Sequence, residues 1–380
     1  MGIFSFGKSA IPIGLDIGTG HFRAAQLSPG NPNPMLTNYA TIKVPVGSVV
    51  EGEVVDIETA SQSLVQLWKK SGLPGKDVAV GIASQKVVVR LIELPFMEKS
   101  ELKNAIQYQA QDYIPIPVEE AIIDAQIVSQ FLSENEEKMM EVLLVAAQKD
   151  LVNNTIAAIE GAGLRPQVVD LSAFAIVRSL LDDQDSFFSA ESERAPGEAT
   201  ALINIGSGLT NIVVVEQGMP RFARVTPMAG DDLTRAIADA IGVPFEEAEE
   251  LKQAVGLPAV DSQESGAEAP ADADRSQAQV VQHVLETQIS YFVAEIRRSI
   301  DYYLTQATQV RNISRLILSG NGASLANIAA YLERGLQATV EISNPLARVK
   351  ISPKLSAEAL TKEEHSMAIP IGLALRGFNK

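Results

Sequence analysis

Two five-residue stretches of the sequence repeat one pattern of polar, apolar and small residues. Residues 16–20 are DIGTG and residues 204–208 are NIGSG. Turns of small residues expose consecutive backbone N–H groups, and such groups attract anions. Thr19 and Ser207 would add hydroxyl donors at equivalent positions. The pattern therefore predicts two phosphate-binding turns that could bind one polyphosphate from both sides.

Charged residues beside the first turn fit the same chemistry. Asp16 ends a predicted strand, where it could hold Mg²⁺ through water, because Mg²⁺ prefers oxygen ligands and keeps several waters. Arg23 adds a cation on the next predicted strand. The alternative is a plain hairpin in which Asp16 caps the turn by accepting hydrogen bonds from local amides. Taken alone, Asp16 favours that cap, and only the second turn favours phosphate.

A dinucleotide-binding turn does not fit the context. That fingerprint needs G-x-G-x-x-G at the start of a helix. Here Gly18 and Gly20 are followed by Arg23 in the third glycine position, and the residues around it are typical of a strand.

A third glycine-rich turn lies near the end of the chain, at residues 320–324, between a predicted strand and a predicted helix. Glycines let a flat ring or a phosphate approach the backbone closely, although an ordinary strand–helix connection explains the turn equally well. Glu249 and Lys252 stand three residues apart on a predicted helix. They could form a surface ion pair, or they could hold a ribose and its ring.

The elements around these turns indicate a duplicated α/β chain. Strand–turn–strand meanders are predicted at 11–46 and 200–227, and each is followed by predicted helices. Between them, residues 86–165 have the pattern of a small α+β module, in which we expect Tyr108, Tyr113 and Ile114 to be core residues. Residues 258–276 are acidic and poor in large apolar residues, which predicts a flexible loop.

Composition limits the function classes. The formal net charge of −16 argues against binding nucleic acid or anionic lipid through a basic face. The absence of cysteine excludes disulfides and thiolate chemistry and fits a reducing cytoplasm. His21, His283 and His365 lie far apart without ligand spacing, so we expect scattered packing or solvent-facing histidines.

The three turns, in this order in a duplicated chain, resemble the actin-like ATPase superfamily, which includes Hsp70, sugar kinases, actin and FtsA. The resemblance implies a ribonuclease H-like α/β fold that binds ATP and Mg²⁺. It assigns the following residues: for the first phosphate turn Asp16, Gly18, Thr19, Gly20 and Arg23; for the second Gly206, Ser207, Gly208 and Thr210; for adenosine Glu249, Lys252, Gly320, Gly322, Ala323 and Ser324.

Two further residues concern catalysis. The stretch VVDLSAFAIVRSL resembles the first connecting helix of the superfamily, which implies a metal- or water-orienting role for Asp170. An ordinary helix-entry residue is an equally good interpretation. The second phosphate turn of the superfamily usually begins with Asp, whereas this chain has Asn204, which could only be a weak metal ligand. We therefore expect ATP binding with at most slow hydrolysis.

The sequence of the module at 86–165 narrows the resemblance to one family. The run ELPFMEKSELKNAIQYQAQDYIPIPVEEAIID, residues 93–124, is similar to the PilM family, the FtsA-like proteins of type IV pili and related type II secretion machines. This resemblance implies the following division: subdomain 1A at 1–85 and 166–199, an inserted FtsA-like 1C at 86–165, 2A at 200–232 and 310–370, 2B at 233–309, and an end, 371–380, that packs on 1A.

The resemblance implies an ATP-binding adaptor. It would lie in the cytoplasm at the inner membrane and bind the cytoplasmic tail of a PilN-type membrane protein in a groove between 1A and 1C. The motor ATPase and platform protein, and a ring or other homo-oligomer, are further partners to test. Because the chain stops at LRGFNK, we expect no direct membrane insertion. A small-molecule kinase or an FtsA-type cell-division filament protein are the alternatives.

Overall fold

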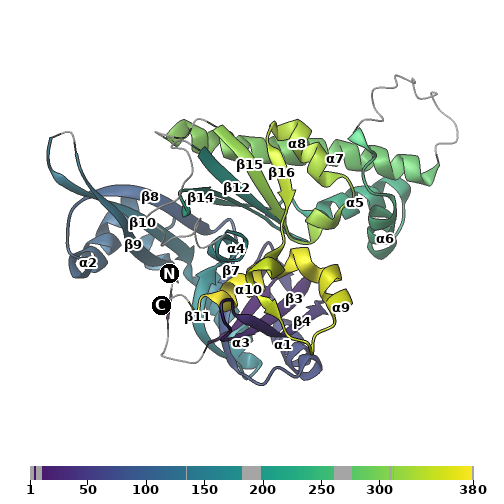
Figure 1. Cartoon of the computed structure of the whole chain (residues 1–380), viewed down its shortest axis with the longest axis horizontal. Coiled ribbons are helices and arrows are strands. Elements are labelled where there is room, and N and C mark those ends of the chain that lie inside the picture. The colour runs from purple at the N-terminus through teal and green to yellow at the C-terminus, as the bar shows by residue number, and fades with distance from the viewer. Residues whose placement is uncertain are drawn as a thin grey trace.

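The computed structural model describes residues 4–5, 11–133, 135–181, 198–260, 276–307, 310 and 312–378. Most of the acidic loop predicted at 258–276 lies outside these residues. Figure 1 shows two sheet-and-helix halves that face each other, with a third, smaller unit beside them. Among the helices of the described ranges, none combines the length and the apolar character needed to span a membrane.

The first half is built on a seven-stranded sheet. Its strands, in spatial order, are β1 (Phe4–Ser5), β11 (Arg165–Leu171), β7 (Asp77–Ile82), β2 (Ile13–Ile17), β3 (His21–Ser28), β4 (Met35–Lys43) and β17 (Lys350–Ile351). Strands β2, β3 and β4 form an antiparallel meander, and β7 pairs with β2 in parallel. Its helices are α1 (Ile57–Ser71), α3 (Lys149–Gly161), α4 (Ser172–Leu180) and α10 (Ala368–Leu375).

Helix α10, from the end of the chain, packs directly on the centre of this sheet and on α4. A Cβ placed on Gly14 of β2 would lie 2.0 Å from the Pro370 carbonyl oxygen. Only glycine permits this approach of helix to strand. Residues 371–375 therefore belong to the core of the first half, which includes Ile369 and Leu373.

The second half repeats the first on a five-stranded sheet. Its strands, in spatial order, are β14 (Met219–Thr226), β13 (Thr210–Glu216), β12 (Glu198–Ile205), β15 (Asn312–Ser319) and β16 (Thr339–Ile342). Strands β12, β13 and β14 form the antiparallel meander, and β15 pairs with β12 in parallel. Its helices are α5 (Gly230–Ile241), α6 (Phe245–Val255), α7 (Gln277–Gln306) and α8 (Ile328–Leu336).

The strand register confirms the duplication at the level of single residues. Asp16 pairs with Arg23 across β2 and β3, and Asn204 pairs with Asn211 across β12 and β13. On their other sides, Asp16 is level with Gly81, and Asn204 is level with Ser319. The two glycine turns therefore end equivalent central strands of two equivalent sheets, and the predicted α/β fold class is confirmed.

A third sheet lies within the module predicted at 86–165. It consists of β8 (Val87–Pro95), β10 (Lys138–Gln148) and β9 (Ala121–Leu132), with α2 (Lys99–Gln109) over its own core. Strand β8 packs against β14 of the second half, and Arg221 on β14 donates a 2.7 Å hydrogen bond to Glu141 on β10. The module thus contacts both halves. The predicted division into subdomains remains a prediction.

Besides short 3-10 helices, the described chain also contains β5 (Val49–Val50), β6 (Glu53–Val54) and α9 (Ala357–Glu363). Ile114 is buried in the module core as expected, but the prediction for the two tyrosines was wrong. Tyr108 is 84% exposed and Tyr113 is 38% exposed. Tyr108 lies on the solvent side of α2, whose buried positions are Leu102 and Ile106, one turn apart.

Candidate functional site

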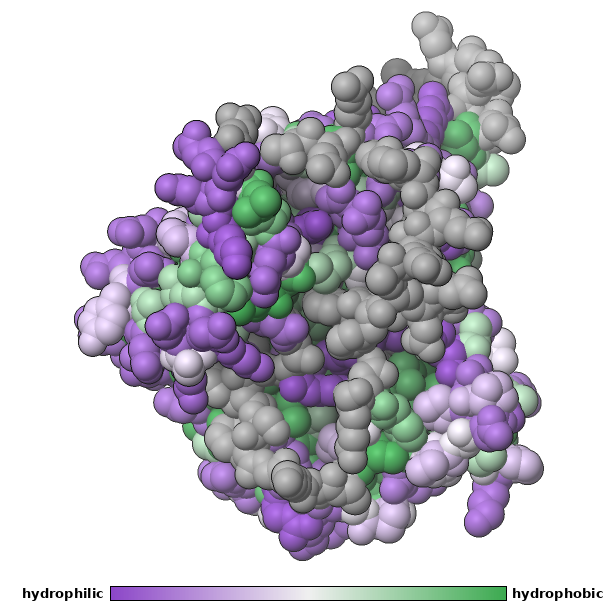
Figure 2. Space-filling view, turned by 60° about the vertical axis from the view of Figure 1, so that its left-hand side comes forward, coloured by the Kyte–Doolittle hydropathy of each residue, from purple (hydrophilic) through white to green (hydrophobic). Residues whose placement is uncertain are grey.

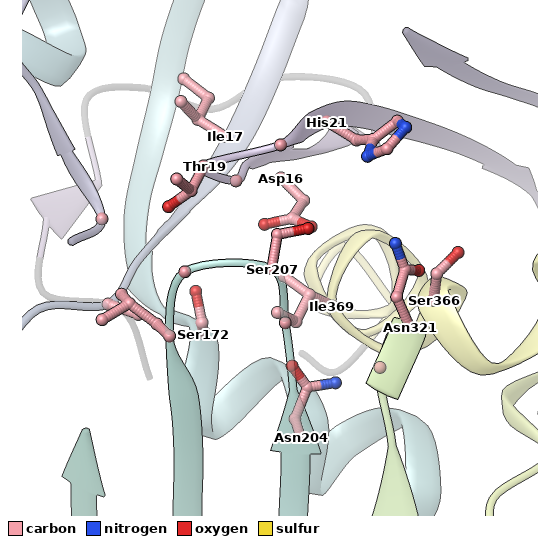
Figure 3. A pocket seen from close by; sticks show the side chains of 18 of the residues that line it. Asp16, Ile17, Thr19, His21, Ser172, Asn204, Ser207, Asn321, Ser366 and Ile369 are labelled. Carbon is pink, nitrogen blue, oxygen red and sulfur yellow. The ribbon is translucent and has the colours of Figure 1, made fainter. Parts of the chain in front are cut away.

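The two repeated turns line one pocket between the halves (Figure 3). The first turn contributes residues 17–20 and the second contributes residues 206–208, while Gly320 and Asn321 come from the turn after β15. Each turn follows the carboxyl end of a central strand. The duplicated fold therefore brings to one place three segments that are far apart in the sequence.

The turns contact each other reciprocally. A Cβ on Gly208 would lie 2.7 Å from the Thr19 hydroxyl oxygen, and a Cβ on Gly20 would lie 2.7 Å from the Ser207 hydroxyl oxygen. Each hydroxyl residue thus occupies the space that a side chain on the opposite glycine would need. The glycines are required here for close approach of one turn to the other, and the two hydroxyls lie at the junction of the halves.

Both turns are closed by the same hydrogen bond. The Gly18 amide donates to the His21 carbonyl at 3.1 Å, and the Gly206 amide donates to the Leu209 carbonyl at 2.8 Å. The start of α5 is tied to the second turn, because the Asp231 amide donates to the Ser207 carbonyl at 2.8 Å. Backbone hydrogen bonds therefore hold both turns in the same shape.

Asp16 and Arg23 give the first turn its charge. Asp16 is 8% exposed, and its burial raises the pKa of the carboxyl group to about 6 although the Arg23 guanidinium opposes this. The two groups are 3.8 Å apart, which is wider than a direct hydrogen bond. Arg23 Nη2 donates instead to Asn321 Oδ1 at 3.0 Å, in the third turn.

The second turn has no charge at the equivalent positions. Asn204 is buried and donates from Nδ2 to the Ser319 hydroxyl at 2.9 Å. Asn211 replaces the arginine of the first half, as the strand register shows. The pocket is therefore electrostatically asymmetric: the first half supplies a carboxylate and a guanidinium, and the second supplies two amides.

Several buried polar atoms of the pocket have no hydrogen-bond partner within the described residues. They are Nδ1 of His21, Nε of Arg23 and Oδ1 of Asn211. A buried polar atom without a partner costs free energy, so such atoms mark where a ligand or water is expected. Together with the glycine turns, Nε of Arg23 and a protonated Nδ1 of His21 are donors that fit a phosphate group, whereas the acceptor Oδ1 of Asn211 fits a water molecule. The described residues include no cluster of three His, Asp or Glu side chains that could bind a metal ion directly.

Of the residues predicted to bind adenosine, Gly320 lines the pocket, and the others lie next to it, outside its immediate lining. Lys252 is buried, and its amine donates to the Gly230 carbonyl at 3.1 Å and to the Thr234 hydroxyl at 2.7 Å. Glu249 lies 2.6 Å from the same amine, and its pKa is lowered by Lys252 and by hydrogen bonds against the opposing effect of burial. This is a buried network that joins α5 and α6 rather than a surface ion pair.

The remaining residues that were predicted to bind nucleotide make contacts within the second half. Thr210 donates to the Met228 carbonyl at 2.8 Å. Gly320 has a φ of 85°, and a Cβ on Gly322 would lie 2.3 Å from Ile205 Cγ2. Ala323 is buried, and Ser324 ends the same short helical turn. These residues seat the third turn on β12, which leaves Asn321 as the polar side chain facing the pocket (Figure 3).

Asp170 lies at the end of β11 and does not line the pocket. Its carboxylate is fully buried, accepts a hydrogen bond from Arg178, and lies 3.0 Å from Nη1 of Arg376. Its neighbour Ser172 lines the pocket instead. The structure therefore does not bring Asp170 together with the phosphate turns, and its carboxylate joins α4 to the end of the chain.

Sequence reasoning missed part of the lining. The missed residues are Ile17, His21, Gly52, Gly81, Ala83, Ser172, Leu209, Asn211, Asn321, Ser366 and Ile369. Asn211 could have been found from the repeat, because it is the counterpart of Arg23. Gly81 and Ser172 come from strands and helices whose neighbours in space are fixed only by the sheet order.

Comparisons with known proteins agree with this geometry. A family model described as "Type IV pilus assembly protein PilM" matches residues 14–378. The cell division protein FtsA of Bacillus subtilis is 22% identical over 358 residues, which cover 88% of this chain and 78% of that protein. FtsA of Escherichia coli K12 is 27% identical over 216 residues, which cover 54% of this chain and 49% of that protein.

Solved structures show the same architecture. The "PilM-PilN type IV pilus biogenesis complex" superposes with a TM-score of 0.79 at 25% identity, covering 98% of this chain and 99% of that one. MreB5 of Spiroplasma citri bound to AMPPNP superposes with a TM-score of 0.50 at 13% identity, covering 95% and 93%. The fold is thus actin-like, and the chain belongs to the PilM family of type IV pilus assembly proteins.

Proposed function

We propose that this protein is an ATP-binding adaptor of the type IV pilus assembly platform, located in the cytoplasm at the inner membrane through its partners. The reciprocal contact of the two glycine turns carries the nucleotide part of the proposal. Thr19 and Ser207 approach the junction from opposite halves, so a polyphosphate between them would be bound by both. MreB5, a neighbour in fold, has been solved with AMPPNP.

The residues present fit ATP with Mg²⁺. The backbone amides and hydroxyls of the two turns would bind the phosphates, and Arg23 would offset their charge. Asp16 would hold Mg²⁺ through water, with Asn204 as a weaker second oxygen donor. Gly320, Gly322, Ala323 and Ser324 would seat the adenine ring, with Glu249 and Lys252 near the ribose. Bound Mg²⁺ would shield the phosphate charge.

Slow hydrolysis follows from the side chains that face the pocket. Asp16 is the single carboxylate among its described lining residues. Asn204 cannot act as a base, and the carboxylate of Asp170 is engaged by two arginines. A water attacking the terminal phosphate would thus have no second carboxylate to orient it. The site is better suited to hold ATP than to hydrolyse it rapidly.

The partner part of the proposal rests on the family and on the solved PilM-PilN complex. We propose that the cytoplasmic tail of a PilN-type membrane protein binds between the first half and the module. The exposed large apolar side chains of the module are Phe96, Tyr108, Tyr113, Phe131 and Leu132. Figure 2 shows the side of the molecule that carries the module, where apolar surface lies among hydrophilic side chains.

An FtsA-type filament protein is the second candidate, because the FtsA relatives match up to 88% of this chain. A small-molecule kinase has less support, since the described pocket lining offers no carboxylate base besides Asp16. Polymerisation with ATP, followed by light scattering, would favour the filament. Phosphoryl transfer to a panel of sugars or carboxylates would favour the kinase.

The adaptor is tested by calorimetry with the tail peptide of the PilN-type protein from the same genome, with Mg·ATP present. The proposal predicts saturable binding of one peptide to each chain. A peptide with the same composition in scrambled order is the control. Absence of binding with Mg·ATP present, in a protein that binds Mg·ATP itself, would remove the adaptor while leaving the nucleotide site intact.

A further inference from the structure

His21 lines the pocket directly after the first phosphate turn, although its sequence position suggested only a packing or solvent-facing histidine. It opens strand β3, and its carbonyl accepts the hydrogen bond that closes the turn, from the Gly18 amide. The backbone of His21 is therefore fixed relative to the phosphate turn. Figure 3 shows its side chain among those that surround the pocket, with Asp16, Ser207 and Asn321.

The imidazole has an unused polar atom. Its Nδ1 is buried and has no hydrogen-bond partner within the described residues. Burying a polar nitrogen without a partner is unfavourable, so folding alone does not explain this placement. An anion held by the adjacent turn would supply an acceptor for a protonated Nδ1.

Burial, helped by neighbouring cations, keeps His21 neutral without an anion. Burial, Arg23 on the same strand and Lys43 on β4 lower its pKa to about 4, against the opposing charges of Glu363 on α9 and Glu249 on α6. The two cations disfavour a third positive charge beside them. A polyphosphate would reverse that balance, because its negative charges favour the imidazolium form.

The second turn shows that the fold does not require a histidine here. Leu209 occupies the equivalent position, since its carbonyl accepts the turn-closing hydrogen bond from Gly206. Leu209 is 8% exposed and lines the same pocket. The repeat therefore offers an internal control, in which the same turn is built with a side chain that cannot bind a proton.

We propose that His21 binds the nucleotide phosphates as an imidazolium and takes up a proton from solvent when they bind. The proposal rests on the proposed nucleotide site and adds a proton-linked contact to it. Nucleotide affinity then depends on pH through a residue that lies five positions from Asp16, and acidification of the surroundings would strengthen nucleotide retention.

The most direct test is NMR of the full chain labelled at histidine. Only three histidines are present, so His21→Gln assigns the His21 resonance, with His283 and His365 as internal references. Without nucleotide, His21 should titrate near pH 4. With saturating Mg·AMPPNP its pKa should rise to at least about 6.5, the ordinary value for histidine. An unchanged pKa in a demonstrated complex would overturn the proposal.

Calorimetry gives an independent readout. Mg·AMPPNP is titrated at pH 6 and pH 8, in buffers of different ionisation enthalpy, into the wild type, His21→Gln and His21→Leu. If the pKa returns to about 6.5, the wild type should gain about fourfold in affinity from pH 8 to pH 6 relative to both variants, with matching proton uptake. His21→Leu copies the second turn, so it should fold normally.

The outcomes separate the two proposals. Equal proton uptake in the wild type and in both variants would overturn the role of His21 while leaving the nucleotide site in place. Absence of binding by the folded wild type would remove the nucleotide site and with it this inference. Because the titration of Asp16 and of the nucleotide is common to all three proteins, the difference between them isolates His21.

Discussion

Arg23 donates a hydrogen bond from Nη2 to Oδ1 of Asn321 at 3.0 Å, although 298 positions separate the two residues in the chain. Arg23 lies on β3 of the first half, and Asn321 lies in the turn that follows β15 of the second half. The same guanidinium lies 3.8 Å from Asp16 and 3.9 Å from Glu363. One buried cation thus joins both halves at the rim of the pocket.

Arg23→Ala should weaken both the fold and nucleotide binding. Removing one partner of a buried charged cluster costs about 3 kcal/mol of unfolding free energy, because the Asp16 carboxyl group stays buried without its counter-ion. Mg·ATP affinity should fall about tenfold or more, since a hydrogen bond to a charged group is worth about 1.5–3 kcal/mol. Chemical denaturation and calorimetry measure the two effects.

The control is Arg165→Ala. Arg165 is also paired with a carboxylate, Asp77 at 2.7 Å, but its side chain is 64% exposed and lies outside the pocket lining. An exposed pair contributes little to stability, because water screens its charges. If the two variants bound Mg·ATP equally well, Arg23 would have no role in the site.

Gly20→Ala should separate the two turns. The added Cβ would lie 2.7 Å from the Ser207 hydroxyl, so the halves must move apart or the hydroxyl must rotate. We expect a lower melting temperature and weaker Mg·ATP binding. The double variant Gly20→Ala, Ser207→Gly removes the clashing atoms and should regain the melting temperature without regaining affinity. A double variant as unstable as the single one would contradict the reciprocal contact.

Asp16→Asn should change how stability depends on pH. The folded-state pKa of about 6 lies above the unfolded value of 3.8, so the folded protein binds this proton more tightly. The stabilisation from Asp16 is thus complete below about pH 4 and is lost as the pH rises through 6. The variant should gain about 3 kcal/mol relative to wild type between pH 4 and pH 7.

Denaturation at several pH values, without nucleotide and Mg²⁺, measures this difference. The contribution of His21 is common to both proteins and cancels. The same variant should bind Mg·ATP more weakly, because an amide is a poorer partner than a carboxylate for the waters of Mg²⁺. A difference between the two proteins that does not vary with pH would show that Asp16 is not buried as a titrating group.

The repeat, the two turns and the alternation of strands and helices were accessible from the sequence, because a duplicated pattern is preserved along the chain. The packing of α10 on β2 was expected only from a resemblance. The burial of Lys252 beneath α5 was not predictable, since a Glu–Lys spacing of three residues is the same on a surface helix and in a buried network. Tyr108 was misassigned although the helical period excludes it from the buried face: it follows the buried Ile106 by two residues, about 200° around α2.

Asp170 shows a second limit. The resemblance of its stretch to the first connecting helix implied a metal- or water-orienting residue, but its partners Arg178 and Arg376 come from α4 and from the residue after α10. No local pattern encodes a contact with a residue that is more than two hundred positions away.

Asp170→Ala should lower the free energy of unfolding, because Asp170 has a structural role and not a catalytic one. It leaves two arginines without their buried carboxylate, which costs about 3–5 kcal/mol. Asp170→Asn also removes the charge but keeps the shape of the side chain, so the ATPase rate is measured on it at a temperature where it is shown to be folded. The rate should stay close to that of wild type. A large loss of turnover in folded Asp170→Asn would restore the catalytic role.

In the proposed site, one nucleotide is bound by turns from both halves. This arrangement is tested most directly by titrating Mg·ATP calorimetrically into wild type, Thr19→Val and Ser207→Ala, which each remove one hydroxyl with little change of shape. We expect one site of micromolar or tighter affinity in the wild type, weakened about tenfold by each substitution. No binding by folded wild type, or binding that neither substitution changes, would contradict it.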